Sequence, residues 1–427
     1  MAGRCRPGME PRHGIAPQSS APDSSEMKIL VANLGSTSLK YRLFDFSDGR
    51  ERMLARGGFE RLTDHGPAIE ACLAELRAGG WMRDASDLAA VGFKVVMARG
   101  LNGCVRLDAA AIEAMEAFNA VAPAHNPPYV NGIRKFARRM PKTPLIGLFE
   151  TAFYQWTPEA AMRYGIPEEW HDLGVRRWGF HGASHKFIAE RSAEILGRED
   201  VAARVRDLYV DGETNPVREP ALRVISCHLG GSTSISGIRN GLAIGNSLGM
   251  SPQSGVLHNN RVGDLDAFAL PYVMRATGMT MAEAERILCK DSGLKGVSGG
   301  HSDMRDLSEA AAKGDARAKL ALEMFVHQTR HWIGAFFAEL NGLDALVFTG
   351  GIGENQANVR EMICRDLDAL GLALDPDANA KAARGAEASL GVSSARAKTL
   401  VIPTNEELVV AREARRLLLK KNPSLRS

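Results

Sequence analysis

The sequence lacks several features that would each assign it to a particular class of protein. No stretch of about 18 uncharged apolar residues occurs, so no membrane-spanning helix is expected. Lys and Arg (53) nearly balance Asp and Glu (50), and a net charge of +3 predicts no basic surface for nucleic acid. The 6 cysteines are scattered without a CxxC pair, which favours free thiols in a reducing cytoplasm over a disulfide scaffold.

Two common phosphate-binding motifs are also missing. The chain contains neither GxxxxGK[ST] nor a strand-GxGxxG-helix fingerprint, which excludes P-loop enzymes and ordinary dinucleotide binders.

The 427 residues of the chain exceed the roughly 250–300 residues of a single core, so two domains are expected. Residues 1–26 are rich in Pro, Ser and Arg and lack the apolar core of a secretory signal. We expect a disordered N-terminal extension there; a basic transit peptide is the alternative, which the acidic residues of the segment disfavour.

A strand-turn-strand unit occurs twice in the chain. Strand-like residues flank the turn LGSTS at 34–38 and the related turn LGGSTS at 229–234. An internal repeat of this kind predicts two similar domains that face one another, although two short segments can also match by chance. Between the units, strands are expected at 88–97 and 144–149, helices at 184–196 and 264–277, and a polar loop at 198–219. This alternation predicts an α/β architecture.

Turns built from small residues recur at 35–38, 230–234 and 350–353. Gly and Ser let backbone N–H groups approach an anion and add hydroxyl donors. Three such turns favour a polyphosphate held between the domains, whereas each turn alone is equally typical of a hairpin or a strand-to-helix connection.

Several polar residues stand in loops or at strand ends, where core packing does not require them. His181 lies between glycines in WGFHGASH, and Arg261 lies in NNRVGD. Glu150 and Asn33 end predicted strands, and carboxylates at strand ends often face the ligand cleft in α/β folds. A surface helix cap is the alternative for Glu150.

Two segments support a functional and a structural interpretation at once. In SDMRD, Arg305 could stack on a base, or Asp303 could simply cap a helix. Thr404 and Glu407 have capping-box spacing, which accounts for Glu407 but leaves Glu406 available to bind Mg²⁺ directly or through water.

Longer motifs make the chain similar to one family. They are VANLGSTSLKYRLFD, APAHNPP, FHGASHKFIAERSAEILG, ISCHLGG, SGLKGVSG, SDMRD, VFTGGIGEN and VIPTNEELVVARE. With them, the chain resembles the acetate kinase family (acetate, propionate and butyrate kinases) from Met27 to Leu418. The resemblance implies an α/β, duplicated actin-like ATPase (ribonuclease H-like) fold, with a cleft between two domains. We expect a substrate-side domain at 27–180, with the C-terminal helix as a candidate addition, and a nucleotide-side domain at 181–427.

The resemblance also implies an activity, its cofactors and its site residues. The γ-phosphoryl group of ATP would pass directly to acetate or a similar short-chain acid, with Mg²⁺ (or Mn²⁺) bound, in a homodimer. The implied catalytic residues are Glu150, His181, Arg261 and His125, and the implied metal ligands are Asn33 and Glu406. The implied substrate-binding residues are Lys94, Val96, Ala124, Phe180 and Pro252. The implied nucleotide-binding residues are Lys40, His228, Leu229, Gly230, Gly231, Ser232, Asp303, Met304, Arg305, Gly351, Ile352, Gly353, Glu354 and Asn355.

The chain departs from the family pattern where the acid should bind. Lys94 replaces an Arg that pairs with the substrate carboxylate, Glu150 replaces an Asp, and Ala124 replaces a Leu of the acyl pocket. Lys keeps the charge but loses the bidentate fork of Arg, and the longer Glu could compensate for the changed cation. Two alternatives follow: the same scaffold acting on a larger or different acid, and a catalytically silent nucleotide-binding paralogue.

Overall fold

A computed structural model of the chain describes residues 27–35, 37–123, 126–210 and 212–421. The segment 1–26, which we expected to be disordered, lies outside the described residues, as do the site candidates Ala124 and His125. No helix in the described part of the chain is both long and apolar enough to cross a membrane.

The first half of the chain builds one six-stranded sheet with the order β3-β2-β1-β4-β6-β5. Its strands are β1 (Lys28–Leu34), β2 (Ser38–Asp45), β3 (Arg52–Glu60), β4 (Leu88–Val95), β5 (Cys104–Arg106) and β6 (Leu145–Phe149). The strands β1, β4 and β6 run parallel, so their carboxyl ends meet at one edge of the sheet. Asn33, Lys94 and Glu150 lie at or directly after these ends.

The second half builds another six-stranded sheet with the order β11-β12-β10-β7-β8-β9. Its strands are β7 (Arg223–His228), β8 (Ser234–Arg239), β9 (Leu242–Asn246), β10 (Ala345–Thr349), β11 (Ala388–Ser389) and β12 (Lys398–Val401). The central strand β10 is buried throughout and apolar up to its last residue, Thr349, because both faces of it are covered. Leu346 and Phe348 pack into one core, and Ala345 and Val347 pack into the core on the other face.

The two sheets have the same topology. The antiparallel hairpins β1-β2-β3 correspond to β7-β8-β9, and the parallel strands β1-β4-β6 correspond to β7-β10-β12. In each sheet a short antiparallel strand, β5 or β11, closes the edge. The sequence repeat at 34–38 and 229–234 therefore marks a repeat of topology, and the prediction of a duplicated α/β fold is confirmed.

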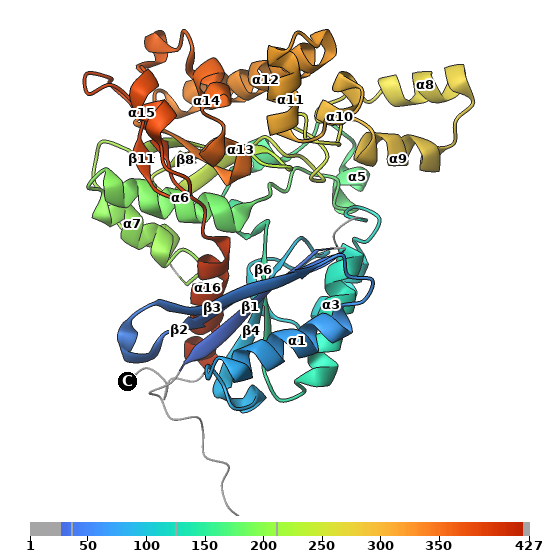
Figure 1. Cartoon of the computed structure of the whole chain (residues 1–427), viewed down its shortest axis with the longest axis vertical. Coiled ribbons are helices and arrows are strands. Elements are labelled where there is room, and N and C mark those ends of the chain that lie inside the picture. The colour runs from blue at the N-terminus through green and yellow to red at the C-terminus, as the bar shows by residue number, and fades with distance from the viewer. Residues whose placement is uncertain (1–26, 36, 124–125, 211, 422–427) are drawn as a thin grey trace, which may run out of the picture.

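The described part of the chain also forms sixteen α-helices. They are α1 (His65–Ala78), α2 (Ala109–Glu116), α3 (Asn126–Arg139), α4 (Glu159–Met162), α5 (Glu168–Asp172), α6 (Gly182–Ile195), α7 (Glu199–Arg206), α8 (Ala269–Thr277), α9 (Met281–Lys290), α10 (Gly293–Ser298), α11 (Met304–Ala312), α12 (Ala316–Leu340), α13 (Gly350–Asn355), α14 (Ala357–Cys364), α15 (Pro376–Lys381) and α16 (Glu406–Lys421). Figure 1 shows two lobes, with α1, α3 and the first sheet below and α6 to α15 above.

Helix α16 returns from the upper lobe to the lower one (Figure 1). Its apolar residues belong to the core of the first sheet: Val409, Val410, Ala411, Ala414 and Leu418. The C-terminal helix thus packs with the first lobe, and its first residue, Glu406, lies between the lobes. The division of the chain at residue 180 stays a prediction.

Three local predictions are wrong in detail. Helix α8 starts at Ala269 and not near Asp264, because the Asp264 carboxylate instead accepts from the backbone N–H of Gly255 (2.8 Å). The segment 198–219 contains α7, whose residues Val201, Ala202 and Val205 are buried at helical spacing. Thr404 forms no capping box: its hydroxyl donates to Ser184 Oγ at 2.9 Å, and α16 begins at Glu406.

Candidate active site

An ion-paired cluster lies where the two lobes meet. Lys94 Nζ is 3.2 Å from Glu150 Oε1 and 2.8 Å from Glu406 Oε2, and the three side chains are only 13–15 % exposed. Burial alone would lower the pKa of Lys94, but the two carboxylates outweigh it and hold that pKa well above its usual range. The ammonium therefore stays charged and joins β4, the end of β6 and the start of α16.

The oxygen donors next to this cluster suit a hard divalent cation. Glu406 Oε1 is buried and has no hydrogen-bond partner among the described residues, while Lys94 outweighs the effect of burial and lowers the pKa of the Glu406 carboxyl. Asn33 Oδ1 accepts from the Tyr129 hydroxyl at 2.7 Å. Carboxylate and amide oxygens are the ligands that Mg²⁺ prefers, so Asn33 and Glu406 fit this ion by chemistry.

His181 is attached to Glu150 through the backbone of a tight turn. The His181 N–H donates to Glu150 Oε2 (3.1 Å), and the Gly182 N–H donates to the Glu150 carbonyl (2.9 Å). His181 itself has a left-handed φ of 57°. A Cβ on residue 182 would lie 2.2 Å from the Glu150 carbonyl oxygen, so only glycine fits there. The glycine after His181 thus holds the imidazole beside the carboxylate.

The His181 imidazole is buried among polar partners. Its Nδ1 lies 2.7 Å from Ser234 Oγ, and its ring stacks on that of His228 with centroids 4.2 Å apart. Burial, together with His228 and Lys94, holds the pKa of His181 well below its ordinary value. The ring is therefore neutral at pH 7.

Arg261 supplies a second cation from the upper lobe. The residue is 9 % exposed, and its guanidinium donates from Nη1 to the Pro252 carbonyl at 2.8 Å. Burial lowers the pKa of Arg261 to about 10, which leaves it charged at neutral pH. It lies close enough to lower the pKa of His181, and Glu150 in turn raises that of Arg261. Arg261 thus lies within electrostatic range of His181 and Glu150, which contact one another through the His181 N–H.

The described residues of the predicted acyl pocket are apolar and buried. Val96 (4 % exposed) and Phe180 (0 %) belong to the core around the first sheet, and Pro252 lies against the Arg261 guanidinium through its carbonyl. The Phe180 carbonyl also accepts from the Tyr154 hydroxyl at 2.9 Å. The apolar side chains of the predicted acyl pocket are therefore held in place by packing in the core.

Two glycine-rich turns meet at the carboxyl ends of β7 and β10. The Leu229 carbonyl accepts from the N–H groups of Ile352 (2.8 Å) and Gly353 (3.1 Å). A Cβ on Gly230 would lie 3.9 Å from Gly351 N, and a Cβ on Gly351 would meet no atom within 4 Å. The buried Ser232 hydroxyl has no partner among the described residues. The backbone of these glycines is therefore not crowded by other atoms, and both this backbone and the Ser232 hydroxyl are available to a ligand.

Further nucleotide candidates lie in α13 and on β2. The Glu354 carboxylate accepts from Gly350 N (3.0 Å) and Thr404 N (3.3 Å), and Asn355 Nδ2 donates to the Gly351 carbonyl (2.8 Å). Lys40 is exposed on β2 and pairs in register with Asn33. These contacts fix the turn at the start of α13 to the segment that leads into α16.

Asp303 and Arg305 interact with one another. Asp303 caps α11 by accepting from the Arg305 N–H at 2.8 Å, which confirms the structural interpretation. The Arg305 guanidinium also donates to both Asp303 oxygens (2.9 and 2.8 Å) and is 75 % exposed. Met304, between them, is buried in the upper core. Stacking of Arg305 on a base stays a prediction.

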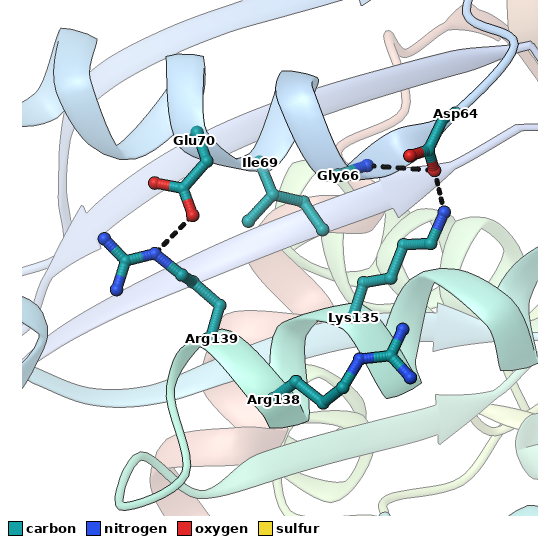
Figure 2. Close-up of a pocket in the computed structure, with 7 residues that line it drawn as sticks. All are labelled: Asp64, Gly66, Ile69, Glu70, Lys135, Arg138 and Arg139. Carbon is teal, nitrogen blue, oxygen red and sulfur yellow. Dashed lines mark hydrogen bonds and ion pairs between the residues drawn. The ribbon is translucent and has the colours of Figure 1, made fainter.

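Two surface hollows lie away from these residues. One, of about 330 Å³, lies between α1 and α3, where Asp64 meets Lys135 and Glu70 meets Arg139 (Figure 2). Another, of about 260 Å³, lies beside α16 and includes Cys104 and Tyr209. Neither is lined by a predicted site residue, and their paired charges explain them as surface packing.

Sequence reasoning missed several polar residues that support the site. They are Tyr129, Ser184, His185, Ser226, Ser234 and His258. Ser234 lies in the repeated turn and His185 lies four residues after His181, so both were within motifs already singled out. Their hydrogen bonds join segments far apart in the sequence, and no spacing rule reveals such partners.

The duplicated fold and the buried charges between its lobes define a two-lobed phosphotransferase of the actin-like ATPase class. The chain belongs to the acetokinase family, whose model matches residues 55–412. It is thus a carboxylate kinase, a phosphotransferase with a carboxyl-group acceptor and ATP as co-substrate. The predicted family membership is confirmed.

Curated relatives and solved structures agree with this assignment. The chain is 38 % identical to the acetate kinase of Carboxydothermus hydrogenoformans, over 92 % of this chain and 100 % of that protein. It is 40 % identical to the acetate kinase of Moorella thermoacetica, over 91 % and 98 %. The crystal structure of Porphyromonas gingivalis acetate kinase matches with a TM-score of 0.79 at 32 % identity, over 92 % and 100 %. That of a propionate kinase from Francisella tularensis matches with a TM-score of 0.78 at 32 % identity, over 91 % and 98 %.

Proposed function

We propose that the protein transfers the γ-phosphoryl group of ATP directly to acetate or a similar short-chain acid, and that it also runs the reverse reaction. The contact of Glu150 with His181, with the buried Arg261 within electrostatic range of both, supports this proposal. Phosphoryl transfer requires in-line placement of donor and acceptor and neutralisation of the charge that spreads over the phosphoryl oxygens. A buried cation and a neutral imidazole beside glycine turns supply both.

Each residue then has a distinct role. Arg261 would neutralise charge on the transferring group, and His181 would donate a hydrogen bond to it. Lys94 would attract the carboxylate of the acid as a point charge, while Glu150 holds both Lys94 and the His181 backbone in place. His125, which lies outside the described residues, stays a catalytic candidate by resemblance alone.

We propose that Asn33 and Glu406 hold Mg²⁺ (or Mn²⁺), directly or through water. The unpartnered Glu406 Oε1 supports this assignment, since Lys94 engages only the other oxygen. When bound, the ion would neutralise negative charge on the phosphates. The open backbone of the β7–β8 turn and of the first residues of α13 would hold the phosphates and the adenosine.

The silent-paralogue alternative has no observation in its favour. His181, Arg261 and Glu406 are all present and each is held by specific partners. Arg261 is a buried cation without an ion-pair partner among the described residues, and burying an unpaired charge is costly. A site under no selection for turnover would have no reason to keep it. The choice between acetate and a larger acid is left to experiment.

Hydroxamate trapping tests the reaction. The protein is incubated with ATP, Mg²⁺ and a series of acids from acetate to valerate, and acyl phosphate is trapped with hydroxylamine. We expect acyl phosphate from at least one acid, and loss of it in Arg261→Ala. No acyl phosphate from any acid, with ATP still bound, would refute the proposal, and relative kcat/KM across the series identifies the preferred acid.

We also propose a homodimer that forms through α8 and α9. Both helices project from the upper lobe (Figure 1), and they and the segment that leads into α8 carry exposed apolar side chains. These are Leu265 (47 %), Phe268 (81 %), Tyr272 (68 %), Val273 (39 %) and Met281 (50 %). Helix α8 buries none of its residues within the chain, so a second copy would remove this apolar surface from water.

Light scattering after size exclusion tests the dimer. We expect Phe268→Asp to produce a monomer, whereas Met53→Asp, a similar change at a 48 % exposed position on β3, should leave the dimer intact. A Phe268→Asp protein that stays dimeric would contradict this interface.

A cytoplasmic location is also proposed. It is supported by the free thiols of Cys72, Cys104, Cys227, Cys289 and Cys364.

A further inference from the structure

Two imidazoles and two serine hydroxyls form one continuous hydrogen-bonded chain behind the site. Ser226 Oγ lies 2.8 Å from His185 Nδ1, and His185 Nε2 lies 2.8 Å from Ser234 Oγ. The same Ser234 oxygen lies 2.7 Å from His181 Nδ1. Ser226, Ser234 and His185 are 0 % exposed and His181 is 8 % exposed, so bulk water is excluded from all four links.

The hydrogens in this chain can be arranged in two ways when Ser234 accepts one hydrogen bond and donates the other, which leaves its own hydrogen paired. Burial holds the pKa values of His181 and His185 well below the ordinary value, so each ring is neutral and carries one N–H. In the forward arrangement, Ser226 donates to His185 Nδ1, His185 Nε2–H donates to Ser234, and Ser234 donates to His181 Nδ1. The reverse arrangement inverts all three donors. The two differ in which nitrogen of His181 carries the hydrogen.

The far end of the chain decides between them. In the forward arrangement the Ser226 hydroxyl donates to His185, and the one hydrogen without a protein acceptor is on Nε2 of His181, which is 8 % exposed, whereas Ser226 is 0 % exposed. In the reverse arrangement Ser226 accepts, and its own hydrogen has no acceptor among the described residues. A buried donor without an acceptor is costly, and this cost should favour the forward arrangement by about ten-fold or more.

We propose that Ser226, His185 and Ser234 are positioning residues that hold His181 in the neutral tautomer with its hydrogen on Nε2. His181 Nε2 makes no hydrogen bond with another described residue, which leaves that N–H available to a ligand. A role for this N–H in phosphoryl transfer rests on the proposed function, whereas the assignment of the tautomer is independent of that function. The assignment explains why four polar groups are buried together in a core that apolar residues could fill.

The stacked His228 shows the same arrangement on a parallel path. Its Nδ1 lies 2.8 Å from Ser184 Oγ, which in turn accepts from the Thr404 hydroxyl at 2.9 Å. Ser184 therefore donates to His228, which places the hydrogen of this ring on Nε2 as well. Two neutral rings 4.2 Å apart avoid the repulsion that a second imidazolium would create.

Nitrogen NMR of the ¹⁵N-histidine-labelled protein tests the tautomer without any turnover. A protonated imidazole nitrogen resonates far upfield of an unprotonated one, and the signals of His181 are identified by their loss in His181→Gln. We expect Nδ1 unprotonated and Nε2 protonated at neutral pH, for His181 and for His185. A hydrogen on His181 Nδ1, or an imidazolium, would overturn the proposal.

Ser226→Ala tests the relay at a distance, since Ser226 does not contact His181. Without the hydroxyl, either arrangement leaves His185 Nδ1 unpaired, so the preference disappears and both His181 tautomers become populated. With about half of His181 in the donating form, kcat should fall about two-fold while KM for ATP is unchanged. Ser234→Ala, which removes the link itself, should lower kcat by about 10-fold, as loss of an orienting partner commonly does.

Ser236→Ala is the matched control. Ser236 is buried on the same strand, but its hydroxyl donates to the Gly245 carbonyl at 2.9 Å and not to an imidazole. We expect its His181 spectrum and kcat to match those of the wild type. An unchanged His181 tautomer in Ser226→Ala would overturn the proposal. If no acid is phosphorylated but the tautomers are as stated, only the proposed function fails.

Discussion

Replacing Glu413 by Gln should destabilise the protein strongly, because it leaves a buried lysine without its counter-ion. Lys186 on α6 and Glu413 on α16 lie 3.1 Å apart, with side chains only 2 % and 1 % exposed. Gln keeps the shape of Glu413 and removes its charge. The other contacts of Lys186 are weak: the Arg206 carbonyl at 3.4 Å and the Tyr209 ring at 5.3 Å.

The magnitude follows from the burial of the pair. Removing one member of a buried ion pair usually costs about 3–5 kcal/mol, since the remaining charge loses its partner and cannot reach water. Lys186→Met should cost less, because Glu413 keeps its bond to Arg416 at 2.6 Å. The double variant Glu413→Gln with Lys186→Met should regain much of the loss, as no unpaired lysine remains. The two lobes are joined through this contact, so the effect should appear in the main unfolding transition.

The pH dependence has a definite sign. Burial already holds the pKa of Lys186 below its ordinary value despite Glu413, and removal of Glu413 lowers it further. Below the native pKa of Lys186, the amine is protonated in both the folded and the unfolded state, and the variant bears the full cost of the unpaired buried charge. Between the native pKa and the higher unfolded pKa only the unfolded state binds it, so stability of the Glu413→Gln variant should rise with pH.

Urea unfolding, followed by fluorescence at neutral and alkaline pH, measures these quantities. The wild type and Lys186→Met are compared with Glu413→Gln and with the double variant. A Glu413→Gln protein within about 0.5 kcal/mol of the wild type would refute the reasoning, since that is the scatter of ordinary surface changes. A loss that Lys186→Met does not relieve would show that the unpaired charge is not its cause.

Three further predictions concern the site. Gly182→Ala should lower kcat about 100-fold with the fold retained by circular dichroism, because the new Cβ would lie 2.2 Å from the Glu150 carbonyl and displace the catalytic turn. Lys94→Met should raise the pKa of the Glu406 carboxyl, since Lys94 now lowers it, and a ¹³C-carboxyl titration that shows no rise would contradict the cluster. Glu406→Gln should weaken Mn²⁺ binding measured by electron paramagnetic resonance, whereas Glu407→Gln, which only loses its pair with Arg42 (3.4 Å), should bind Mn²⁺ normally.

The fold was largely predictable because its signals are local. The run Ile29–Ala32 and the turns at 34–38 and 229–234 mark the central hairpins of both sheets, and each hairpin forms between neighbours in sequence. The longer family motifs then defined the duplicated fold and the family. Prediction failed at 198–219, where polar surface residues hide the helical spacing of Val201, Ala202 and Val205.

The candidate site was predictable as a set of residues and not as a geometry. The local sequence alone marks loop or helix-start positions at His181, Arg261 and Glu406, without any knowledge of the tertiary fold. The pairing of Lys94 with Glu406 joins residues 312 positions apart, and no sequence pattern reports it or the pairing of Lys94 with Glu150. The same is true of the serines that contact His181 and His185.

By itself, the sequence determined the residue types, the strand-turn units and their repetition, because these depend on neighbours along the chain. Only the tertiary structure decided that one ammonium serves two carboxylates, that a glycine ties His181 to Glu150, and that α16 packs with the first lobe. Ion pairs, tautomers and pKa values depend on distance and burial in three dimensions, and these exist only once both lobes have folded around their shared helix.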